Sequence, residues 1–513
     1  MSGVFSNATI LNKISIMSLK IHLIFSPTLK IDKGGSIGAE TIPPFGILFI
    51  ASFLRKTIAD IEIKITNGLL VGMEKTLSEI KAYPSDICGL SFQSSNALGA
   101  YEISKIIKRE YPKKLIVMGG VHSTIMPEDV LQFSHADLVC IGEGEVTFSE
   151  IVKNFLKYKK DTNKTNFSDV SGIVFKHKGN IIQTPSRSII ENLDDIPFPS
   201  WDLIDISQYA GGHIVLSKKR PSIGVMFSRG CTFNCSFCAN EMWKQHKPYM
   251  RRRSPNHCFD EVELLIKKYN IKEYVDKGND FNTDLEHALE MCHTKIKRNI
   301  DTFWFTQLRA YPMTDALAKI MKDANCWGIS IGVESANKET LIGIKKNITL
   351  SQFEKSCEIL KKHGIKVLAN FMFLNAWEHN NELHYENIEK SQNTLNYAKH
   401  LLRDNLIDYF TWSQATPYPG SDLYRIAIKY NLIKDGYGKN WDEWNHSWDF
   451  VMKLPGINVK DCQRLKNMGT LLQAKALLSN IDNINISSGK FILKKATYFM
   501  GNLLKHGVFP KKA

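Results

Sequence analysis

The sequence contains no run of apolar residues as long as the ~18 that a helix needs to cross a bilayer. Its first 16 residues are polar and lack the apolar core of a secretory signal. We therefore expect no membrane-spanning segment. We also expect residues 1–16 to be a disordered extension ahead of the first domain.

The sequence also lacks the regularly spaced cysteines of a disulfide framework. The ten cysteines are scattered over 513 residues, and most lie in apolar runs that are typical of buried thiols. This usage fits a reducing cytoplasm rather than a secreted, disulfide-rich domain. Seven of them stand alone, at Cys88, Cys140, Cys258, Cys292, Cys326, Cys357 and Cys462.

A block of consecutive basic residues is missing as well, although Lys and Arg outnumber Asp and Glu by 66 to 52 and the formal net charge is +14. The basic residues are spread along the chain, and aromatic residues do not interleave with them as in a nucleic-acid-binding surface. We expect a solvated basic surface and no nucleic-acid partner. The length and the 43% apolar content predict a globular protein of about two to four domains.

The other three cysteines stand close together in the segment Ser228–Cys238. In the spacing C-x3-C-x2-C, they are Cys231, Cys235 and Cys238. Three thiolates this close can bind three irons of one cubane cluster, and because no fourth cysteine follows nearby, one iron would stay open for a ligand. The alternative is a zinc site. Such sites usually add a second pair of Cys or His, whereas His246 and His257 each stand alone.

This segment resembles the cluster motif of the radical S-adenosylmethionine superfamily. The resemblance implies that Cys231, Cys235 and Cys238 hold a 4Fe-4S cluster whose fourth iron is chelated by S-adenosylmethionine. In that superfamily an electron from the cluster cleaves the sulfonium and yields a 5′-deoxyadenosyl radical. Phe237 matches the aromatic position that lies near the adenine, which implies a contact with S-adenosylmethionine.

Three further stretches have counterparts in this superfamily. Gly332–Ser335 is similar to the element near the ribose of S-adenosylmethionine, which implies that Glu334 and Ser335 bind the cofactor; the alternative is a surface ion pair. Thr416–Tyr424 resembles the segment that closes the barrel. The arginines of Arg251–Ser254 either touch carboxylates or phosphates or form a solvated loop.

The sequence departs from the superfamily pattern at two places. The subgroup usually carries an Asp-Asp pair after the second barrel strand, where this chain has Gly278–Asn279. The subgroup also usually carries a G-x-P-G-E turn after the fifth strand, where this chain has Leu374–Glu378 and keeps the glutamate alone. These changes predict an altered substrate pocket, a weakened cofactor site or a decaying enzyme, and the intact cysteines argue against the last.

Strands and helices alternate over about residues 17–165. Five apolar runs predict strands, at Ile21–Phe25, Ile61–Ile65, Ile87–Phe92, Leu115–Met118 and Leu138–Ile141. This alternation predicts a doubly wound parallel sheet, which binds ligands outside the carboxyl ends of its strands. The residues at those ends are candidate ligand contacts, with plain turns as the alternative; they are Ser91, Gly119, Gly120, Gly142, Glu143 and Gly144.

These stretches together resemble the cobalamin-binding domain found ahead of many radical S-adenosylmethionine enzymes. The matching pieces are Pro43–Gly46, Ile87–Phe92, Gly119–His122 and Ala136–Glu145. The resemblance implies bound cobalamin, with the strand-end residues as its contacts. The D-x-H-x-x-G motif, whose histidine ligates cobalt in some cobalamin proteins, is absent, and His122 is a weak alternative ligand.

The rest of the chain divides into a linker, a second α/β domain and a terminal region. The linker, about 166–215, has a predicted hairpin and two prolines that favour an extended connection. Over about 216–430 a strand followed by a helix recurs about six times, which predicts a partial (β/α)6 barrel with its active site at the carboxyl ends of the strands. Region 431–513, with Trp441, Trp444 and Trp448, predicts a mostly helical basic cap, or a helix in peripheral contact with lipid.

Our interpretation is a cytoplasmic, cobalamin-dependent radical S-adenosylmethionine enzyme. The resemblance implies methyl transfer to an unactivated carbon or phosphorus, in which one S-adenosylmethionine methylates cobalamin and a second supplies the radical. A ring-forming or rearranging enzyme without methyl transfer and a metal-binding protein without turnover are the alternatives. We expect a small-molecule or lipid-linked substrate and a cellular electron donor, and the sequence assigns no catalytic residue beyond the cofactor contacts.

Overall fold

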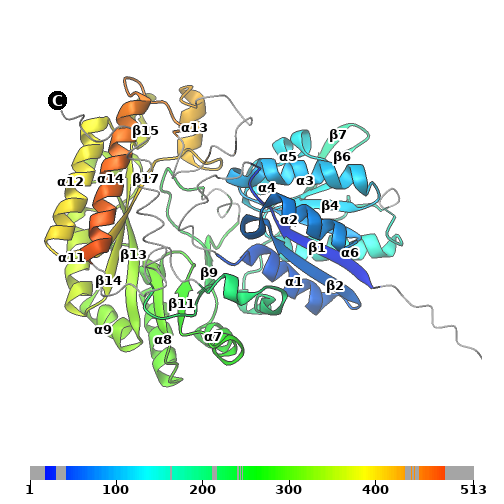
Figure 1. The fold of residues 1–513 in the computed structure, drawn as a ribbon, viewed down its shortest axis with the longest axis horizontal. Coiled ribbons are helices and arrows are strands. Elements are labelled where there is room, and N and C mark those ends of the chain that lie inside the picture. Colours follow the sequence, from blue (N-terminus) through cyan, green and yellow to red (C-terminus); the bar gives the residue numbers. More distant parts are fainter. Residues whose placement is uncertain are drawn as a thin grey trace, which may run out of the picture.

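The computed structural model describes residues 18–29, 42–161, 165–210, 217–239, 242, 244, 246–433, 441, 444 and 450–479. The predicted extension 1–16, Trp448 and the basic tail from residue 480 lie outside the described residues. Figure 1 shows two lobes side by side, an N-terminal lobe in blue and cyan and a C-terminal lobe in green to orange. The two lobes contain the two α/β folds that the sequence predicts, and the predicted boundaries near residues 165, 215 and 430 stay predictions.

A seven-stranded sheet forms the N-terminal lobe, in the order β2-β1-β3-β4-β5-β6-β7. The strands are β1 (Leu19–Phe25), β2 (Ile61–Asn67), β3 (Ile87–Ser91), β4 (Leu115–Gly119), β5 (Leu138–Cys140), β6 (Ile173–His177) and β7 (Asn180–Gln183). The first five are parallel, which confirms the predicted doubly wound sheet, and their order reverses between β1 and β3. The hairpin predicted in the linker is β6–β7, and it extends this sheet because β6 pairs antiparallel with β5.

Helices cover both faces of this sheet. On one face, α1 (Phe45–Thr57) and α6 (Gly144–Lys157) pack against side chains such as Leu23 and Val117. The other face carries α2 (Gly68–Ala82), α3 (Ala97–Glu110), α4 (Val121–Ile125) and α5 (Pro127–Phe133). Successive strand residues point to opposite faces, so the continuous apolar runs supply both cores.

The C-terminal lobe is a half barrel whose six strands are all parallel and follow one another in chain order. They are β8 (Ser222–Val225), β11 (Glu273–Asp276), β12 (Phe303–Leu308), β13 (Cys326–Glu334), β14 (Lys366–Phe373) and β17 (Tyr409–Gln414). The helices of this lobe include α7 (Pro255–Tyr269), α8 (Leu285–Lys297), α9 (Asp315–Asp323), α10 (Lys338–Gly343), α11 (Leu350–Lys362), α12 (Ile388–Arg403) and α13 (Asp422–Lys429). This arrangement confirms the predicted partial (β/α)6 barrel.

The last described helix, α14 (Val459–Ser479), closes the free edge of the half barrel. It lies along β17, where the side chain of Gln473 donates to the carbonyl oxygen of Phe410 at 3.0 Å. The indole of Trp412 donates to the carbonyl oxygen of Leu465 at 3.2 Å. An edge strand exposes unpaired backbone groups, and α14 covers part of this edge.

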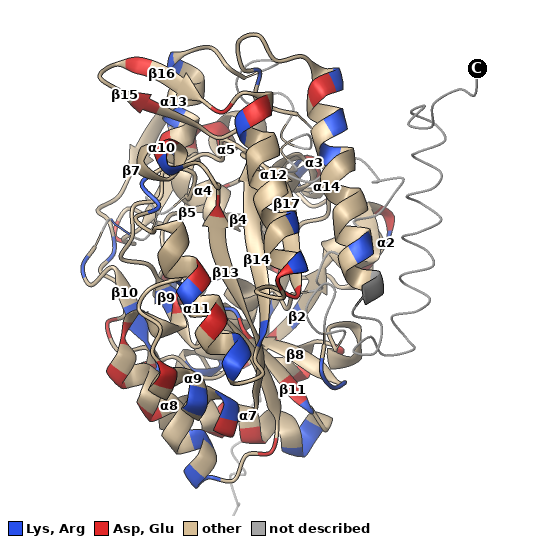
Figure 2. Ribbon diagram, turned by 90° about the vertical axis from the view of Figure 1, so that its left-hand side faces the viewer, with Lys and Arg blue, Asp and Glu red and all other residues tan. Residues whose placement is uncertain are grey.

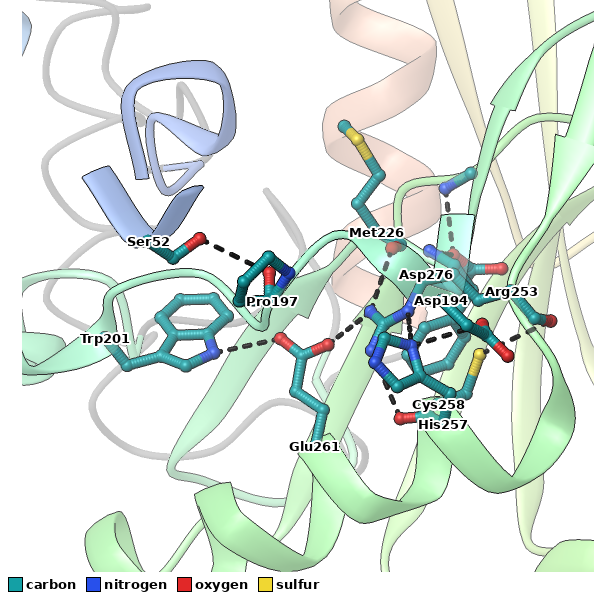
Figure 3. A network of polar contacts seen from close by, with 12 residues as sticks. Ser52, Asp194, Pro197, Trp201, Met226, Arg253, His257, Cys258, Glu261 and Asp276 are labelled. Atoms are coloured by element: carbon teal, nitrogen blue, oxygen red, sulfur yellow. Dashed lines mark hydrogen bonds and ion pairs between the residues drawn. The ribbon is translucent and has the colours of Figure 1, made fainter. Parts of the chain in front are cut away.

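A buried ionic network anchors the linker to the half barrel (Figure 3). Arg253 and Glu261 are 3% and 0% exposed, and they form an ion pair at the start of α7. The indole of Trp201, in the linker, donates to Glu261 at 2.9 Å. The hydroxyl of Ser52, on α1, donates to the carbonyl oxygen of Pro197 at 3.3 Å. The linker is therefore held by polar contacts to both lobes.

Charge is mixed over the surface of the half barrel. In the view of Figure 2, basic and acidic residues are interspersed along α7, α8 and α9. Among the described residues, no helix is long and apolar enough to span a membrane.

Candidate active site

The cysteine segment is held by an antiparallel ribbon, which we call the cysteine ribbon. It consists of β9 (Ser228–Gly230), β10 (Met250–Arg252) and the loop between them. Gly230 has a φ of +89°, and a Cβ at this position would lie 2.0 Å from the carbonyl oxygen of Tyr249. Glycine alone fits so close an approach. The ribbon directly follows β8, at the carboxyl end of the first barrel strand.

The three predicted cluster ligands lie together in this loop. Cys231 and Cys235 are each 9% exposed, whereas Cys238 is exposed. Burial raises the pKa of the Cys231 thiol to about 12, and the nearby carboxylate of Asp280 raises it further. Such a thiol keeps its proton in the metal-free protein and releases it when a metal cation binds the sulfur.

Backbone hydrogen bonds fix the middle of the cysteine loop to the helices above the barrel. The amide of Ser236 donates to the carbonyl oxygen of Ile344 at 2.9 Å, and the amide of Leu423 donates to Ser236 at 2.8 Å. In the described part of the chain, no group of three or more Cys, His, Asp and Glu side chains converges to hold a single metal ion. A cluster does not need such convergence, because each cysteine binds a different iron.

The segment that replaces the expected Asp-Asp pair supports the ribbon directly. A Cβ at Gly278 would lie 2.3 Å from the hydroxyl oxygen of Ser228, so no larger side chain fits there without a shift. The side chain of Asn279 donates to the carbonyl oxygen of Gly230 at 2.9 Å. Asp280, at a φ of +49°, accepts a hydrogen bond from the Cys231 thiol at 2.9 Å. The residues that replace the Asp-Asp pair therefore change how the segment after β11 contacts the ribbon. One carboxylate, that of Asp280, remains beside Cys231.

Glu334 lies near the cysteine loop, at a bulge where β13 ends. Its φ of +71° is unusual for a residue other than glycine, and the register between β13 and β14 shifts at this point. Its carboxylate forms a buried ion pair with Lys346 at 2.7 Å, and the Lys346 ammonium lies 5.8 Å from the centre of the Phe237 ring. Burial favours the neutral form of Lys346, but Glu334 and Cys235 outweigh this effect and raise its pKa.

Ser335, the other cofactor contact predicted in this stretch, is bonded to a protein carboxylate, and its contact with S-adenosylmethionine stays a prediction. Its hydroxyl donates at 2.6 Å to Glu386, a carboxylate that is 0% exposed. The backbone amide and the side-chain amide of Asn375 also donate to Glu386, at 3.2 and 3.0 Å. Ser335 therefore helps to hold the loops after β13 and β14 together.

The stretch that replaces the G-x-P-G-E turn leads into an extra hairpin. β15 (Ala376–His379) pairs with β16 (Glu382–Tyr385), and Trp377 packs against Gly343 of α10. The retained glutamate, Glu378, forms an ion pair with Lys429 at 2.8 Å on the surface. It does not face the cysteine loop.

Arg309 is a site residue that the sequence analysis did not identify. It follows the last residue of β12, and its guanidinium lies 3.5 Å from the centre of the Phe233 ring in the cysteine loop. Arg309 is 6% exposed and donates to the carbonyl oxygen of Lys346 at 2.5 Å, with no carboxylate partner among the described residues. The sequence signal that could have identified Arg309 is its position directly after an apolar strand of the barrel.

Two buried polar atoms on this face of the half barrel fit a polar ligand. In the described residues, the hydroxyl oxygen of Ser236 and the side-chain oxygen of Gln414 have no hydrogen-bond partner. Ser236 lies in the cysteine loop, and Gln414 ends β17. Buried polar atoms normally have partners, so these positions suit a bound molecule such as S-adenosylmethionine or a substrate.

Four predicted contacts meet at the carboxyl edge of the N-terminal sheet. Ser91 and Gly119 are neighbours on β3 and β4. Gly120, at a φ of +105°, and Gly142, at +79°, are joined through the hydroxyl of Thr124, which donates to Gly120 and accepts from the amide of Gly142. A Cβ at Gly142 would meet nothing within 4 Å, so space is open beside it. This edge fits a large ligand that approaches the backbone closely.

His122 is not available as a cobalt ligand. It is 0% exposed, and its two ring nitrogens are hydrogen-bonded to Ser94 at 2.9 Å and to Tyr101 at 3.0 Å. The indole of Trp441 packs against its ring, with centroids 4.7 Å apart. The chain lacks the histidine of the D-x-H-x-x-G motif, and His122 does not replace it as a cobalt ligand.

Glu143 and Gly144, the other two predicted cobalamin contacts, make contacts between elements of the protein, and their contact with cobalamin stays a prediction. Glu143 forms an ion pair with Arg251 of the cysteine ribbon. A Cβ at Gly144 would lie 2.8 Å from Ile50, so this glycine permits α6 to pack closely on α1. Both residues serve the packing of the lobes.

Family models match both lobes. Residues 38–152 match the B12 binding domain, and residues 225–390 match the radical SAM superfamily. The first covers the strand-end glycines of the N-terminal sheet, and the second covers the cysteine ribbon and most of the half barrel.

Similar proteins share this arrangement. An uncharacterised methyltransferase of Pyrococcus horikoshii is 30% identical over 93% of this chain and 97% of its own. An anaerobic magnesium-protoporphyrin IX monomethyl ester cyclase of Rubrivivax gelatinosus is 27% identical over 76% of this chain and 67% of its own. The solved radical S-adenosylmethionine methyltransferase TsrM of Kitasatospora setae, with cobalamin and a [4Fe-4S] cluster bound, superposes with a TM-score of 0.65 at 14% identity, over 92% of this chain and 90% of its own. The chain therefore belongs to the radical S-adenosylmethionine enzymes that carry a B12-binding domain, and its cofactors are a 4Fe-4S cluster, S-adenosylmethionine and cobalamin.

Proposed function

We propose that this enzyme is a cobalamin-dependent methyltransferase that acts on an unactivated carbon or phosphorus. The observation that carries the proposal is the position of the cysteine ribbon, which is ion-paired to the B12-binding lobe through Arg229 and Arg251. The two cofactor domains therefore adjoin at the ribbon. The name of the Pyrococcus relative, a methyltransferase, supports the same reaction.

The cluster ligands in this proposal are Cys231, Cys235 and Cys238. When bound, the reduced cluster with S-adenosylmethionine supplies a carbon radical, and cobalamin supplies a methyl carrier. The ribbon orients the three thiols, with Gly230 allowing its close turn and Asn279 tying it to β11.

S-adenosylmethionine is proposed to contact Phe237 and Glu334. Two buried cations in this neighbourhood, Lys346 and Arg309, suit an anionic group such as the methionine carboxylate. Asp280, beside Cys231, suits the ammonium group of the same molecule. In this proposal these side chains bind and orient the cofactor.

Cobalamin is proposed to lie at the carboxyl edge of the N-terminal sheet, against Ser91, Gly119, Gly120 and Gly142. The open space at Gly142 and the buried hydroxyl of Ser123, which has no partner among the described residues, fit a bulky, polar ligand. Because both ring nitrogens of His122 are hydrogen-bonded, to Ser94 and Tyr101, we expect cobalt to receive no ligand from this residue.

The proposal is tested by product analysis of the anaerobically reconstituted enzyme with reductant and S-adenosylmethionine. Methyl transfer to cobalamin predicts S-adenosylhomocysteine in samples that contain cobalamin and none in samples without it. Equal amounts of S-adenosylhomocysteine in both samples, or none in either when iron and cobalamin are fully loaded, would contradict the methyltransferase.

A second candidate is a ring-forming reaction without methyl transfer. The relative named as a cyclase in Rubrivivax gelatinosus favours it. It predicts 5′-deoxyadenosine with no cobalamin-dependent S-adenosylhomocysteine. In either case the reaction requires a cellular electron donor, and a cytoplasmic setting is proposed because none of the ten cysteines forms a disulfide.

A further inference from the structure

Two arginines of the cysteine ribbon stand directly opposite each other. Arg229 on β9 and Arg251 on β10 are register partners, and Arg229 lies two residues before the first cluster cysteine. Like charges that face each other across an antiparallel pair repel. Both residues are also buried, at 9% and 6% exposed, so water screens this repulsion poorly. The ribbon therefore needs anionic partners to adopt this shape.

Those partners come from the other lobe. Glu145 accepts a hydrogen bond from Arg229 at 2.6 Å, and Glu143 is ion-paired with Arg251 and lies 3.4 Å from Arg229. Glu143 thus contacts both arginines. The four side chains carry no net charge together, which offsets the repulsion within the ribbon. We call them the ribbon network.

The structure around the two glutamates fixes their position. Glu143 is the N-cap residue of α6, without a side-chain capping hydrogen bond, and Glu145 lies in the first turn, where the helix dipole favours negative charge. Glu145 is 3% exposed, and the Arg229 guanidinium also lies 4.9 Å from the centre of the Phe49 ring on α1. Gly142, a proposed cobalamin contact, directly precedes Glu143. Gly142 therefore lies at the proposed cobalamin edge, and the next residue, Glu143, contacts the cysteine ribbon.

We propose that the ribbon network sets the distance between the cluster and cobalamin, with Arg229, Arg251, Glu143 and Glu145 as positioning residues. The network keeps the cysteine ribbon at a fixed position relative to the loop that follows β5. A methyl carrier and a radical source must both reach one substrate, so their separation has to be fixed. The proposal rests on the two cofactor sites assigned above, but it does not depend on methyl transfer.

The test measures that distance in the reconstituted full-length enzyme. The singly reduced cluster and cob(II)alamin are both paramagnetic, so pulsed electron paramagnetic resonance reports the distribution of distances between them. We expect one narrow distribution in the wild type and a broad one in the double variant Glu143→Gln, Glu145→Gln, with iron and cobalamin contents unchanged.

The matched control is Glu150→Gln, on the same helix. Glu150 is ion-paired with Arg187 inside the N-terminal lobe, so its loss removes an α6 ion pair that does not reach the ribbon. The control should keep the narrow distribution. A double variant that also keeps it would overturn the proposal, since the network would then add stability alone. A double variant that loses cobalamin and keeps iron would overturn it too, because Glu143 would be a cobalamin contact.

A second set of variants covers the case in which the glutamate variant does not fold. Removing one partner of a buried ion pair leaves an unpaired charge, whereas removing both does not. We therefore expect the pair Glu143→Gln, Arg251→Gln to lower the melting temperature less than the two single changes together. Strictly additive shifts would contradict a direct coupling between the lobes at this pair.

Discussion

Gly230 is the single residue on which the shape of the cysteine ribbon depends most. Gly230→Ala would place a Cβ 2.0 Å from the carbonyl oxygen of Tyr249, so the ribbon must open. We expect the variant to lose most of its iron after reconstitution. Gly179→Ala is the control, because Gly179 has a similar φ of +85° and open space around it. Both changes cost about 1–2 kcal/mol of backbone strain, but the control should bind iron normally.

Arg309 supplies a prediction about cofactor affinity. Arg309→Gln should weaken the binding of S-adenosylmethionine about ten- to a hundredfold, because a hydrogen bond to a charged group contributes about 1.5–3 kcal/mol. The dissociation constant of the cluster-loaded enzyme measures this change. Arg298→Gln, which disrupts surface ion pairs with Asp260 and Glu263, is the control. Equal affinity in the Arg309 variant would remove this residue from the cofactor site.

Local spacing singles out the three cysteines in the sequence, and their role as cluster ligands stays a prediction. The three cysteines and Gly230 form one contiguous motif, and they lie together in the structure. Ser335 was also singled out by local spacing, whereas its partner Glu386 is 51 residues away, and the sequence gives no sign of that contact. Arg309 was missed for the same reason, since its relation to the cysteine loop exists only in the folded chain.

At the scale of elements, the start of β11 carries a buried acid that makes stability depend on pH. Glu273 is 0% exposed and accepts hydrogen bonds from Lys218, Lys219 and Ser222, yet burial raises its pKa to about 7. The fold thus favours the protonated carboxyl. Its contribution becomes unfavourable as pH rises from about 4.5 to about 7, by about 3 kcal/mol in total.

Glu273→Gln should therefore reduce the loss of stability between pH 5 and pH 8. Melting temperatures of the holoenzyme at the two pH values measure it, with Glu263→Gln, an exposed residue of α7, as the control. An unchanged difference between the two melting temperatures would show that Glu273 does not titrate in this range.

Elements were predictable from the sequence where apolar runs are continuous. The strands of both sheets follow such runs, and α11 begins with a capping box of Thr349 and Gln352, whose spacing can be read from the sequence. The α2 helix was missed because Gly72, at a φ of +78°, interrupts its pattern. The β15–β16 hairpin was missed because its turn, Asn380 and Asn381 at positive φ, has no glycine to mark it.

At the scale of the whole molecule, the ribbon network joins the two cofactor domains. The fold of each lobe follows from its own stretch of sequence, whereas the ribbon network joins residues 84 and 108 positions apart. Gly142, Glu143 and Gly144 were therefore assigned together to cobalamin, although Gly142 is bonded to Thr124 at the ligand edge and Glu143 is ion-paired with Arg251 of the ribbon. A local pattern cannot show which lobe a side chain will face.

The most direct test of the account is the yield of 5′-deoxyadenosine from the wild type and from the variants Cys231→Ala, Cys235→Ala and Cys238→Ala. Each enzyme is reconstituted with iron and sulfide under anaerobic conditions and given reductant and S-adenosylmethionine. Cys258→Ala, a buried cysteine of α7, is the control. The account predicts 5′-deoxyadenosine from the wild type and the control and none from the three ribbon variants. Wild-type yields from any ribbon variant would contradict it.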